Sequence, residues 1–282
     1  SQPNPIAVRQ AAQPGLETAR RGLKHPDRVR VMEHPDVSMS QRTDQGRGRT
    51  FRGIETCQTK FHQCRSYATL LIGGVRAGKS VAAGNELRRL AKHPGNRILV
   101  VKHTMVEVQR SIKQTLFGDD AFQEGVFPKH WIKENHSKSQ REPHYVLPNN
   151  TKIYLGGLND RGKWGGTDYS VALIDDVFNP KRIGGQITKL DFEYIDGRLS
   201  FTGGSGGAEG PERRIFLTSN PPANKRHWLY EEFPEYQTRD RALIHFPTED
   251  NRDNLPPDYI EEKTRQYGEA WVKRYLKGLP VE

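Results

Sequence analysis

Short, unbroken runs of apolar residues alternate with longer helical patterns along the chain from Tyr67 onward. This alternation is typical of βα units that build a largely parallel sheet, because parallel strands are usually buried on both faces. Four runs are predicted to be core strands: residues 67–72, 97–101, 171–174 and 214–218. The pattern therefore predicts an α/β fold in which helices flank a mainly parallel sheet.

Helical patterns follow the first two of these strands. One helix is predicted to begin within the glycine-rich stretch after Ile72 and to end near Lys92, because Pro94-Gly95 cannot continue a helix. An amphipathic helix is predicted over residues 106–116. Such helices suit a parallel sheet, since parallel strands cannot be joined by a tight turn.

A hairpin and a pair of helices are predicted elsewhere in the chain. Residues 145–147 and 152–155 flank Pro148-Asn149-Asn150, and these turn residues favour a tight connection between two strands. Near the end of the chain, apolar and aromatic residues over 256–277 recur at helical spacing around a break at Gly268. This stretch is therefore predicted to form two short helices.

The composition divides the chain into three parts. Residues 1–50 contain several prolines and scattered arginines with little apolar periodicity, which predicts a basic, partly disordered extension. It could serve as an arm for a partner or be a solvated tail. Residues 51–250 hold the predicted α/β domain, and residues 251–282 are predicted to form a small helical lid.

The overall charge and the cysteine content narrow the class of protein. The 282 residues carry 44 Lys and Arg against 34 Asp and Glu, a formal net charge of +10. This charge favours nucleic acid as a partner, although a basic surface without a ligand is an equal alternative. Cys57 and Cys64 imply no disulfide framework, which fits a reducing compartment. No apolar run could span a bilayer, so no membrane partner is expected.

The glycine-rich stretch after the first predicted strand matches the pattern G-x-x-x-x-G-K-[ST], and a predicted helix follows it. In this context, backbone N–H groups converge on phosphate oxygens at a helix N-terminus, where the helix dipole favours negative charge. Lys79 should contact the β and γ phosphates, and the Ser80 hydroxyl should ligate Mg²⁺. The predicted nucleotide-binding residues are Gly73, Gly74, Val75, Arg76, Ala77, Gly78, Lys79 and Ser80.

Two aspartates close the third apolar run. Asp175 is predicted at the carboxyl end of a buried strand, beside the phosphate loop, where its carboxylate can hold hydrated Mg²⁺. Asp176 follows at the position where many P-loop ATPases place a glutamate that activates the attacking water. Its side chain is one methylene shorter than glutamate. Asp176 could instead cap the next helix, or stand in place of a native glutamate.

Two further polar segments extend the candidate site. Gln58 lies ahead of the first core strand, and its amide can recognise adenine because it offers both a donor and an acceptor. Thr218, Ser219 and Asn220 end the fourth predicted strand, where short polar side chains can sense the γ phosphate. Pro221-Pro222 stiffens the exit. A plain strand-to-loop turn is the alternative for this segment.

Four features together resemble the ATPase domain of tailed-bacteriophage large terminases, the motors that pump viral DNA into procapsids. Gln58 resembles the family's adenine-recognising motif, and Arg76 resembles the arginine within its phosphate loop. The pair Asp175-Asp176 resembles the magnesium and catalytic-acid segment, except that the family's usual glutamate is an aspartate in this chain. Residues 214–222 resemble the motif that couples hydrolysis to movement.

The resemblance runs from about residue 57 to residue 282 and implies a RecA-like P-loop fold of the additional-strand type. It implies an ATPase that binds ATP and Mg²⁺ and couples hydrolysis to translocation of double-stranded DNA. Catalytic roles follow for Asp176, Lys79 and Arg76. The family also uses an arginine that reaches the neighbouring subunit's nucleotide, for which Arg161 is the first candidate and Arg110 the second.

The family further implies partners and a place of action. The partners are double-stranded DNA, a portal protein, a small terminase subunit and further copies in a homo-oligomeric ring, a pentamer by resemblance. The place is the host cytoplasm, with transient docking on the procapsid. The lid over residues 251–282 resembles a linker toward a metal-dependent nuclease domain, and no nuclease activity is expected from this chain.

Two alternatives to a packaging motor stay open. One is a RecA-type helicase or translocase, which should show a second RecA-like domain, whereas the chain after Asn220 leaves room only for a short helical lid. The other is a nucleotide-binding module with weak or no hydrolysis, because Asp176 replaces the usual glutamate.

Overall fold

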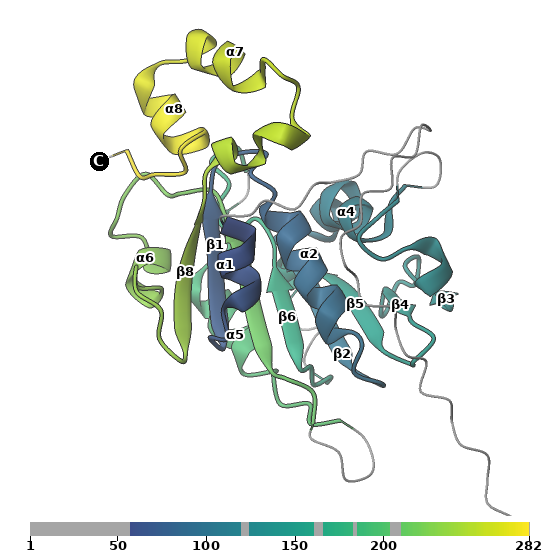
Figure 1. Cartoon of the computed structure of the whole chain (residues 1–282). Helices are drawn as coiled ribbons and strands as arrows, with labels where there is room; N and C mark the ends of the chain where they lie inside the picture. The colour runs from purple at the N-terminus through teal and green to yellow at the C-terminus, as the bar shows by residue number, and fades with distance from the viewer. Residues whose placement is uncertain (1–56, 120–123, 161–165, 183–184, 204–209, 282) are drawn as a thin grey trace, which may run out of the picture. The chain divides into compact units, whose positions relative to one another are not determined.

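A single eight-stranded sheet organises the fold. The computed structural model describes residues 57–119, 124–160, 166–182, 185–203 and 210–281, all within one compact unit that spans residues 46–282. The strand order is β3-β4-β5-β2-β6-β7-β1-β8 (Figure 1). The six strands from β5 to β8 pair in parallel, and β4 and β3 continue the sheet as an antiparallel edge. The predicted extension over residues 1–50 lies outside the described residues.

The elements follow the chain in alternating order. The strands are β1 (Ala68–Gly73), β2 (Arg97–Lys102), β3 (Glu134–Asn135), β4 (His144–Val146), β5 (Lys152–Gly157), β6 (Val171–Ile174), β7 (Arg214–Ser219) and β8 (Arg241–Phe246). The helices of the main body are α1 (Cys57–Gln63), α2 (Lys79–Leu90), α3 (Met105–Glu107), η1 (Val108–Ile112), α4 (Lys113–Phe117), η2 (Lys129–Trp131), α5 (Lys189–Asp196) and α6 (Trp228–Glu232). Three further helices complete the C-terminal part: η4 (Thr248–Asn254), α7 (Tyr259–Gln266) and α8 (Glu269–Tyr275).

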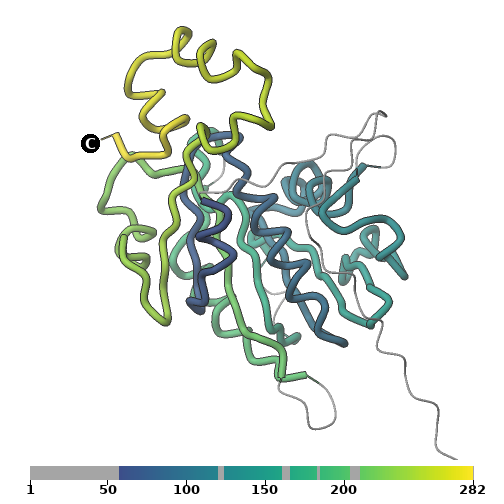
Figure 2. The backbone as a smooth tube through the Cα atoms, viewed as in Figure 1, coloured from purple at the N-terminus to yellow at the C-terminus, as the bar shows by residue number. Residues whose placement is uncertain are grey.

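Apolar side chains cover both faces of the sheet, because successive residues of a strand point to opposite faces. On β1, Leu71 belongs to the core that includes α1, α2 and the α3–α4 segment, whereas Leu70 belongs to the core that includes α5 and α6. Both leucines are fully buried. The sheet therefore lies between two helical layers, as the path of the chain shows in Figure 2. This arrangement leaves the carboxyl ends of the parallel strands as the edge where loops meet.

The predicted strands are confirmed. The four apolar runs are β1, β2, β6 and β7, and the predicted hairpin is the antiparallel pair β4–β5. The prediction that only a short helical lid follows Asn220 was wrong, because β8 pairs with β1 and adds a sixth parallel strand. The sequence of β8, RALIHF, begins with Arg241 and has His245 between its apolar residues, and four of its six positions are only half-buried. An edge strand of this kind lacks the unbroken apolar run of a central strand.

The helix predicted over residues 106–116 is confirmed, but it is not a regular α-helix. It consists of α3, the π-helical turn η1 and α4 in direct succession. Thr104 caps its start, with its side chain accepting a hydrogen bond from the Glu107 amide at 3.2 Å. π-Helical turns inside α-helices are frequent at functional sites.

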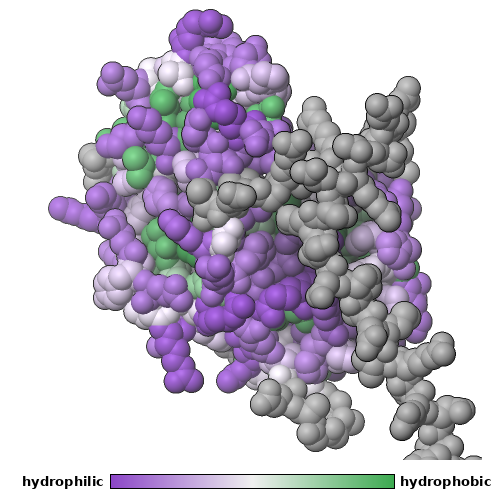
Figure 3. All heavy atoms as spheres, in the orientation of Figure 1, coloured by the Kyte–Doolittle hydropathy of each residue, from purple (hydrophilic) through white to green (hydrophobic). Residues whose placement is uncertain are grey.

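The C-terminal part forms a lid of η4, α7 and α8. Its two predicted helices are confirmed, and Gly268 at the predicted break is the N-cap residue of α8. No residue of α7 or α8 is fully buried, although Tyr267 and Trp271 stack with ring centroids 4.1 Å apart. In the view of Figure 3 hydrophilic residues cover most of the visible surface, with a few apolar residues among those of the lid. None of the helices in the described ranges is long and apolar enough to cross a membrane.

Candidate active site

The glycine-rich loop joins the end of β1 to the start of α2 and lies at the carboxyl edge of the sheet. Gly78, the N-cap residue of α2, has a φ of 82°, a left-handed conformation that favours glycine. A Cβ atom on Gly73 would come within 1.9 Å of the Phe246 carbonyl oxygen, and one on Gly74 within 2.3 Å of the Thr248 hydroxyl oxygen. The glycines at these positions therefore let β8 and the lid approach the loop backbone.

Lys79 folds back across this loop. Its Nζ donates to the carbonyl oxygens of Gly73 at 3.0 Å and Gly74 at 2.5 Å, and lies 3.4 Å from Oδ1 of Asn220. Loss of water around the ammonium lowers the pKa of Lys79 to about 8, although the carboxylates of Asp176 and Asp175 act in the opposite direction. A triphosphate would supply the negative charge that this ammonium lacks in the loop.

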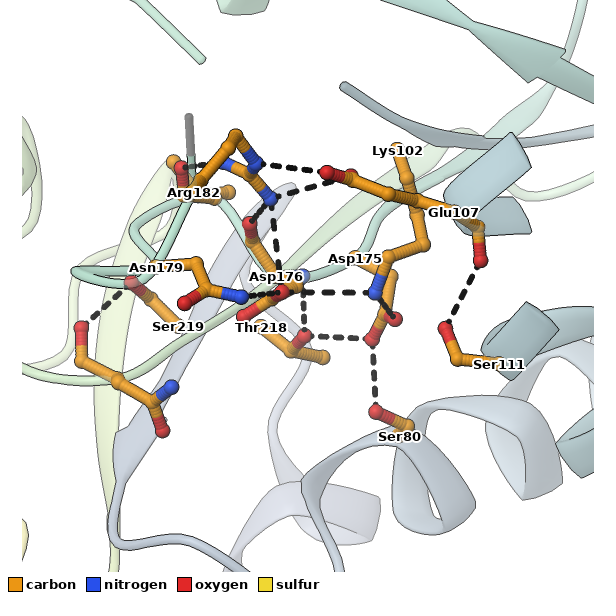
Figure 4. A network of polar contacts seen from close by, with 12 residues as sticks. Ser80, Lys102, Glu107, Ser111, Asp175, Asp176, Asn179, Arg182, Thr218 and Ser219 are labelled. Atoms are coloured by element: carbon orange, nitrogen blue, oxygen red, sulfur yellow. Dashed lines mark hydrogen bonds and ion pairs between the residues drawn. The ribbon is translucent and has the colours of Figure 1, made fainter. Parts of the chain in front are cut away.

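Asp175 follows β6 and is surrounded by donors from three other segments. Its Oδ1 accepts hydrogen bonds from the hydroxyls of Ser80 and Thr218, both at 2.7 Å, and its Oδ2 accepts one from Lys102 Nζ at 2.8 Å (Figure 4). Burial raises the pKa of Asp175, but the Lys102 ammonium and the hydrogen bonds outweigh it and lower the pKa. The carboxylate is therefore held in its ionised form.

Asp176 occupies a different environment from its neighbour. Its φ of 60° is left-handed, which is uncommon for a residue other than glycine. Its backbone N–H donates to Thr218 Oγ1 at 3.0 Å, and its Oδ2 accepts from Asn179 Nδ2 at 2.8 Å. The side chain is 23% exposed, so the carboxylate can reach water that enters the site. This is the access that a water-activating group requires.

The segment after β7 joins the two halves of the site. Thr218 bonds both aspartates, and Asn220 is the residue opposite Lys79 Nζ. Ser219 points away from this pair, since its hydroxyl donates to the Asn220 carbonyl at 2.8 Å and accepts from the Phe178 amide at 3.2 Å. Two of the three predicted coupling residues thus contact the site: Thr218 bonds the acidic pair, and Asn220 lies beside the lysine of the phosphate loop.

The lid is hydrogen-bonded to the phosphate loop at consecutive residues. Val75 N–H donates to the Tyr275 carbonyl at 2.7 Å, and the Val75 carbonyl accepts from the Thr248 hydroxyl at 2.7 Å. Asn251 Nδ2 donates to the Arg76 carbonyl. On the other side of the site, Arg274 of α8 donates from Nε to the Pro221 carbonyl at 2.9 Å. The lid therefore touches both the loop and the segment after β7.

Not every predicted residue falls into this cluster. Gln58 lies in the first turn of α1 and is partly exposed. The side chain of Arg76 is exposed, with a φ of 59°. Arg161 lies outside the described residues, and Arg110 is an exposed residue of η1. The structure thus brings together Lys79, Ser80, Asp175, Asp176, Thr218 and Asn220.

Three charged residues of the site were not predicted from the sequence. Lys102 ends β2 and lies 2.8 Å from Asp175 and 3.7 Å from Asp176. Arg182 and Glu107 form an ion pair at 3.1 Å beside Asp176. One signal was available for Lys102, because it closes the apolar run RILVVK at a position equivalent to that of Asp175. Nothing in the sequence indicated the other two.

The oxygen donors at this edge fit a magnesium ion. A carboxylate of Asp175 and the Ser80 hydroxyl are hard ligands that lie 2.7 Å apart. Across the described ranges, no group of three or more His, Cys, Asp or Glu side chains could hold a metal. Mg²⁺ often binds through one or two carboxylates together with substrate phosphates and water, so a site built from Asp175 and Ser80 suits it.

Comparison with known proteins places these features in a family. The sequence pattern of the phage terminase large subunit family matches residues 65–278. The structure of a large terminase from a thermophilic bacteriophage, in complex with ATP-gamma-S, has a TM-score of 0.58 at 16% identity, covering 81% of this chain and 52% of that one. The ATPase domain of the Thermus phage P74-26 large terminase has a TM-score of 0.51 at 13% identity, covering 79% and 92%.

These structural matches show a shared RecA-like fold. The chain spans about half the length of the terminase that was solved with ATP-gamma-S. A search among curated protein sequences gave no match.

Proposed function

The chain belongs to the phage terminase large subunit family, and we propose that it is the ATP-hydrolysing motor domain of a packaging machine that drives double-stranded DNA into a procapsid. The observation that carries this proposal is the convergence of Lys79, Ser80, Asp175 and Asp176 at one edge of the sheet. The first of the two terminases compared above, which shares the fold, has been solved with ATP-gamma-S and with ADP.

The proposed mechanism rests on positioning and electrostatics. The phosphate loop would cradle the triphosphate at the N-terminus of α2, with Lys79 against the β and γ phosphates. Asp175 and Ser80 would hold Mg²⁺, which neutralises charge on the phosphate oxygens when it is bound. Asp176 would orient and polarise the attacking water. Arg76, and Arg161 from a neighbouring copy, would add positive charge around the γ phosphate, and Gln58 would recognise adenine.

We propose a route from hydrolysis to movement through Asn220 and Arg274, which is supported by their contacts. Asn220 lies next to Lys79 Nζ, so it would sense whether a γ phosphate is bound. The chain then passes Pro221, whose carbonyl accepts a hydrogen bond from Arg274 of the lid. We propose that residues 218–220 carry the nucleotide state to α8 along this route.

The wider setting is also a proposal. The net charge of +10 favours DNA as the substrate that is moved. By family, the motor would assemble as a homo-oligomeric ring, with a portal protein and a small terminase subunit as partners, on a procapsid in the host cytoplasm. Binding of duplex DNA should therefore weaken steeply as salt is added.

A phosphate-release assay tests the proposed activity. Wild-type protein at high concentration, with duplex DNA and Mg²⁺, should hydrolyse ATP. The turnover of Lys79→Ala should be at least about 100-fold lower, because the variant lacks the positive charge that would stabilise the transferring phosphoryl group. Lys138→Ala removes an exposed lysine and serves as the matched control. ATP binding without Lys79-dependent turnover would mean a binding module, and unwinding of a forked duplex would mean a helicase.

A further inference from the structure

Asp176 holds a backbone conformation that its surroundings must enforce. A left-handed φ in a residue other than glycine is strained and persists only where other contacts fix it. The φ of Asp176 is 60°. Thr218 holds its N–H and Asn179 donates to its carboxylate, as described above, but neither contact reaches the Asp176 carbonyl.

Arg182 contacts both the carbonyl and the carboxylate of Asp176. Its Nη2 donates to the Asp176 carbonyl oxygen at 2.6 Å and lies 3.5 Å from Asp176 Oδ2 (Figure 4). The side chain of Arg182 is only 2% exposed. A buried guanidinium is costly unless its donors are satisfied, so its placement against both the backbone and the carboxylate of one residue requires an explanation.

The remaining donors of Arg182 are also occupied. Nε donates to Glu107 Oε1 at 3.1 Å, and Nη1 donates to the Val177 carbonyl and to Gln186 Oε1, both at 3.2 Å. Glu107 belongs to α3, which follows β2 and its terminal Lys102. The guanidinium plane is therefore fixed from one side by the loop after β6 and from the other by α3. A planar group with donors fixed in this way holds its partner in one orientation.

We propose that Arg182, braced by Glu107, is a positioning residue that fixes the backbone and carboxylate of Asp176 for its work on water, an inference that rests on the function proposed above. Lys102 Nζ lies 3.7 Å from the same oxygen, Asp176 Oδ2. Two cations therefore lie near Asp176 Oδ2, and Arg182 is the one that also binds the main chain of Asp176. A shift of about 1 Å in a group that positions water can cost about 100-fold in rate.

The test measures turnover, nucleotide affinity and local opening in the same variants. Arg182→Gln should lower kcat by roughly 10-fold or more while the affinity for a fluorescent ATP analogue changes by less than about 3-fold, because the aspartate is misplaced but the phosphate loop is intact. Glu107→Gln keeps the shape of the side chain that braces Arg182. It should also lower kcat with little change in affinity, but by a smaller factor. Arg182→Lys keeps the positive charge but lacks the planar guanidinium, so its kcat should lie between those of the wild type and Arg182→Gln. Arg265→Gln, an exposed arginine of α7, is the matched control.

A double-mutant cycle separates positioning from a general structural role. If Arg182 acts through Asp176, then adding Arg182→Gln to Asp176→Ala should lower kcat by less than about 2-fold further. The proposal would be overturned if the fall in kcat of the double variant equalled the product of the two single falls. An unchanged kcat in Arg182→Gln would also overturn it.

Amide hydrogen exchange over residues 175–182 provides a readout that needs no turnover. Exchange there should speed up by at least about 10-fold in Arg182→Gln and stay unchanged in Arg265→Gln, because the clamp on the Asp176 backbone is lost. Unchanged exchange in Arg182→Gln would overturn the clamp. A wild-type protein without Lys79-dependent turnover would instead overturn the proposed function, while exchange still decides whether Arg182 holds Asp176.

Discussion

The acidic pair at the end of β6 and the lid both contain many charges, but they use them differently. Asp175 is 3% exposed and Lys102 is 5% exposed, and their partners come from four separate segments of the chain. In the lid, Arg252 pairs with Glu249 and Glu261, and Lys263 with Glu262. These side chains are exposed or half-exposed, and all of them belong to the lid itself. The charges of the acidic pair are buried and have partners that are distant in the sequence. The charges of the lid lie at the surface and have partners within the lid.

The difference separates charges that the chemistry requires from those that keep the surface solvated. A buried ion pair rarely adds stability over an apolar packing of the same volume, because both ions lose water. A chain that buries Asp175 with Lys102 therefore keeps the pair for another purpose, which the proposed nucleotide site provides. Surface pairs such as those of the lid contribute little and are screened by salt.

Breaking the buried pair should have the largest effect on folding. Asp175→Asn keeps the shape of the side chain but leaves the Lys102 ammonium without its closest carboxylate. The free energy of unfolding should fall by about 3–5 kcal/mol, as measured by urea denaturation. The lid variant Asp253→Asn, at an exposed position, should leave the denaturation midpoint unchanged. If Asp175→Asn and Asp253→Asn had the same denaturation midpoint, the buried and the exposed charges would not differ in their contribution to stability.

The lysine of the phosphate loop should give the site a pH dependence. The pKa of Lys79 is about 8 in the free protein, and bound phosphates would raise it, so ATP binding takes up a proton above pH 8. The association constant for ATP should therefore fall by up to about 10-fold per pH unit above pH 8. Below pH 7, protonation of Lys79 should no longer change it. Isothermal titration calorimetry in two buffers should record the proton uptake. A profile in Lys79→Met identical to that of the wild type would contradict this assignment.

The contact between the lid and the phosphate loop should give a moderate effect. Thr248→Val keeps the volume of a fully buried residue and removes the hydrogen bond to the Val75 carbonyl. Unfolding should become easier by about 1 kcal/mol. Affinity for the fluorescent ATP analogue should fall by a few fold, since the loop loses one of its braces. Thr264→Val, whose exposed hydroxyl donates to the Ile260 carbonyl within α7, is the matched control and should change neither quantity.

The smallest effect is expected at the surface of the lid. Arg252→Gln removes the charge that pairs with Glu249 and Glu261, but all three side chains are well exposed. The melting temperature should stay within experimental error at 0.5 M salt and shift only slightly at low salt. A large shift at high salt would show that the lid charges act like those of the buried pair.

Local chemistry made part of this site predictable from the sequence. The phosphate loop could be predicted because each glycine, the lysine and the serine serve a need that is set within eight neighbouring residues. Asp175 could be predicted because a carboxylate closes an apolar run. Lys102 closes a similar run, so the same reasoning applied to β2 would have found it.

Long-range geometry explains what could not be predicted. Arg182 reaches Asp176 only because the loop after β6 turns back on itself, and Glu107 joins it from another layer of the fold. The edge strand β8 was missed because half-buried positions dilute its apolar pattern. Features fixed by contacts between distant segments leave little trace in local composition.

The hydrogen bonds between Val75 and the lid also bear on how the protein acquires its site during synthesis. Thr248 lies 173 positions after Val75 in the chain, and Tyr275 lies farther still. Contacts at this separation close late, because a long loop must be ordered first. A nascent chain that has not yet released α8 from the ribosome would therefore carry the phosphate loop without its braces. Full nucleotide affinity should then arise only after α8 has been synthesised and has docked on the phosphate loop.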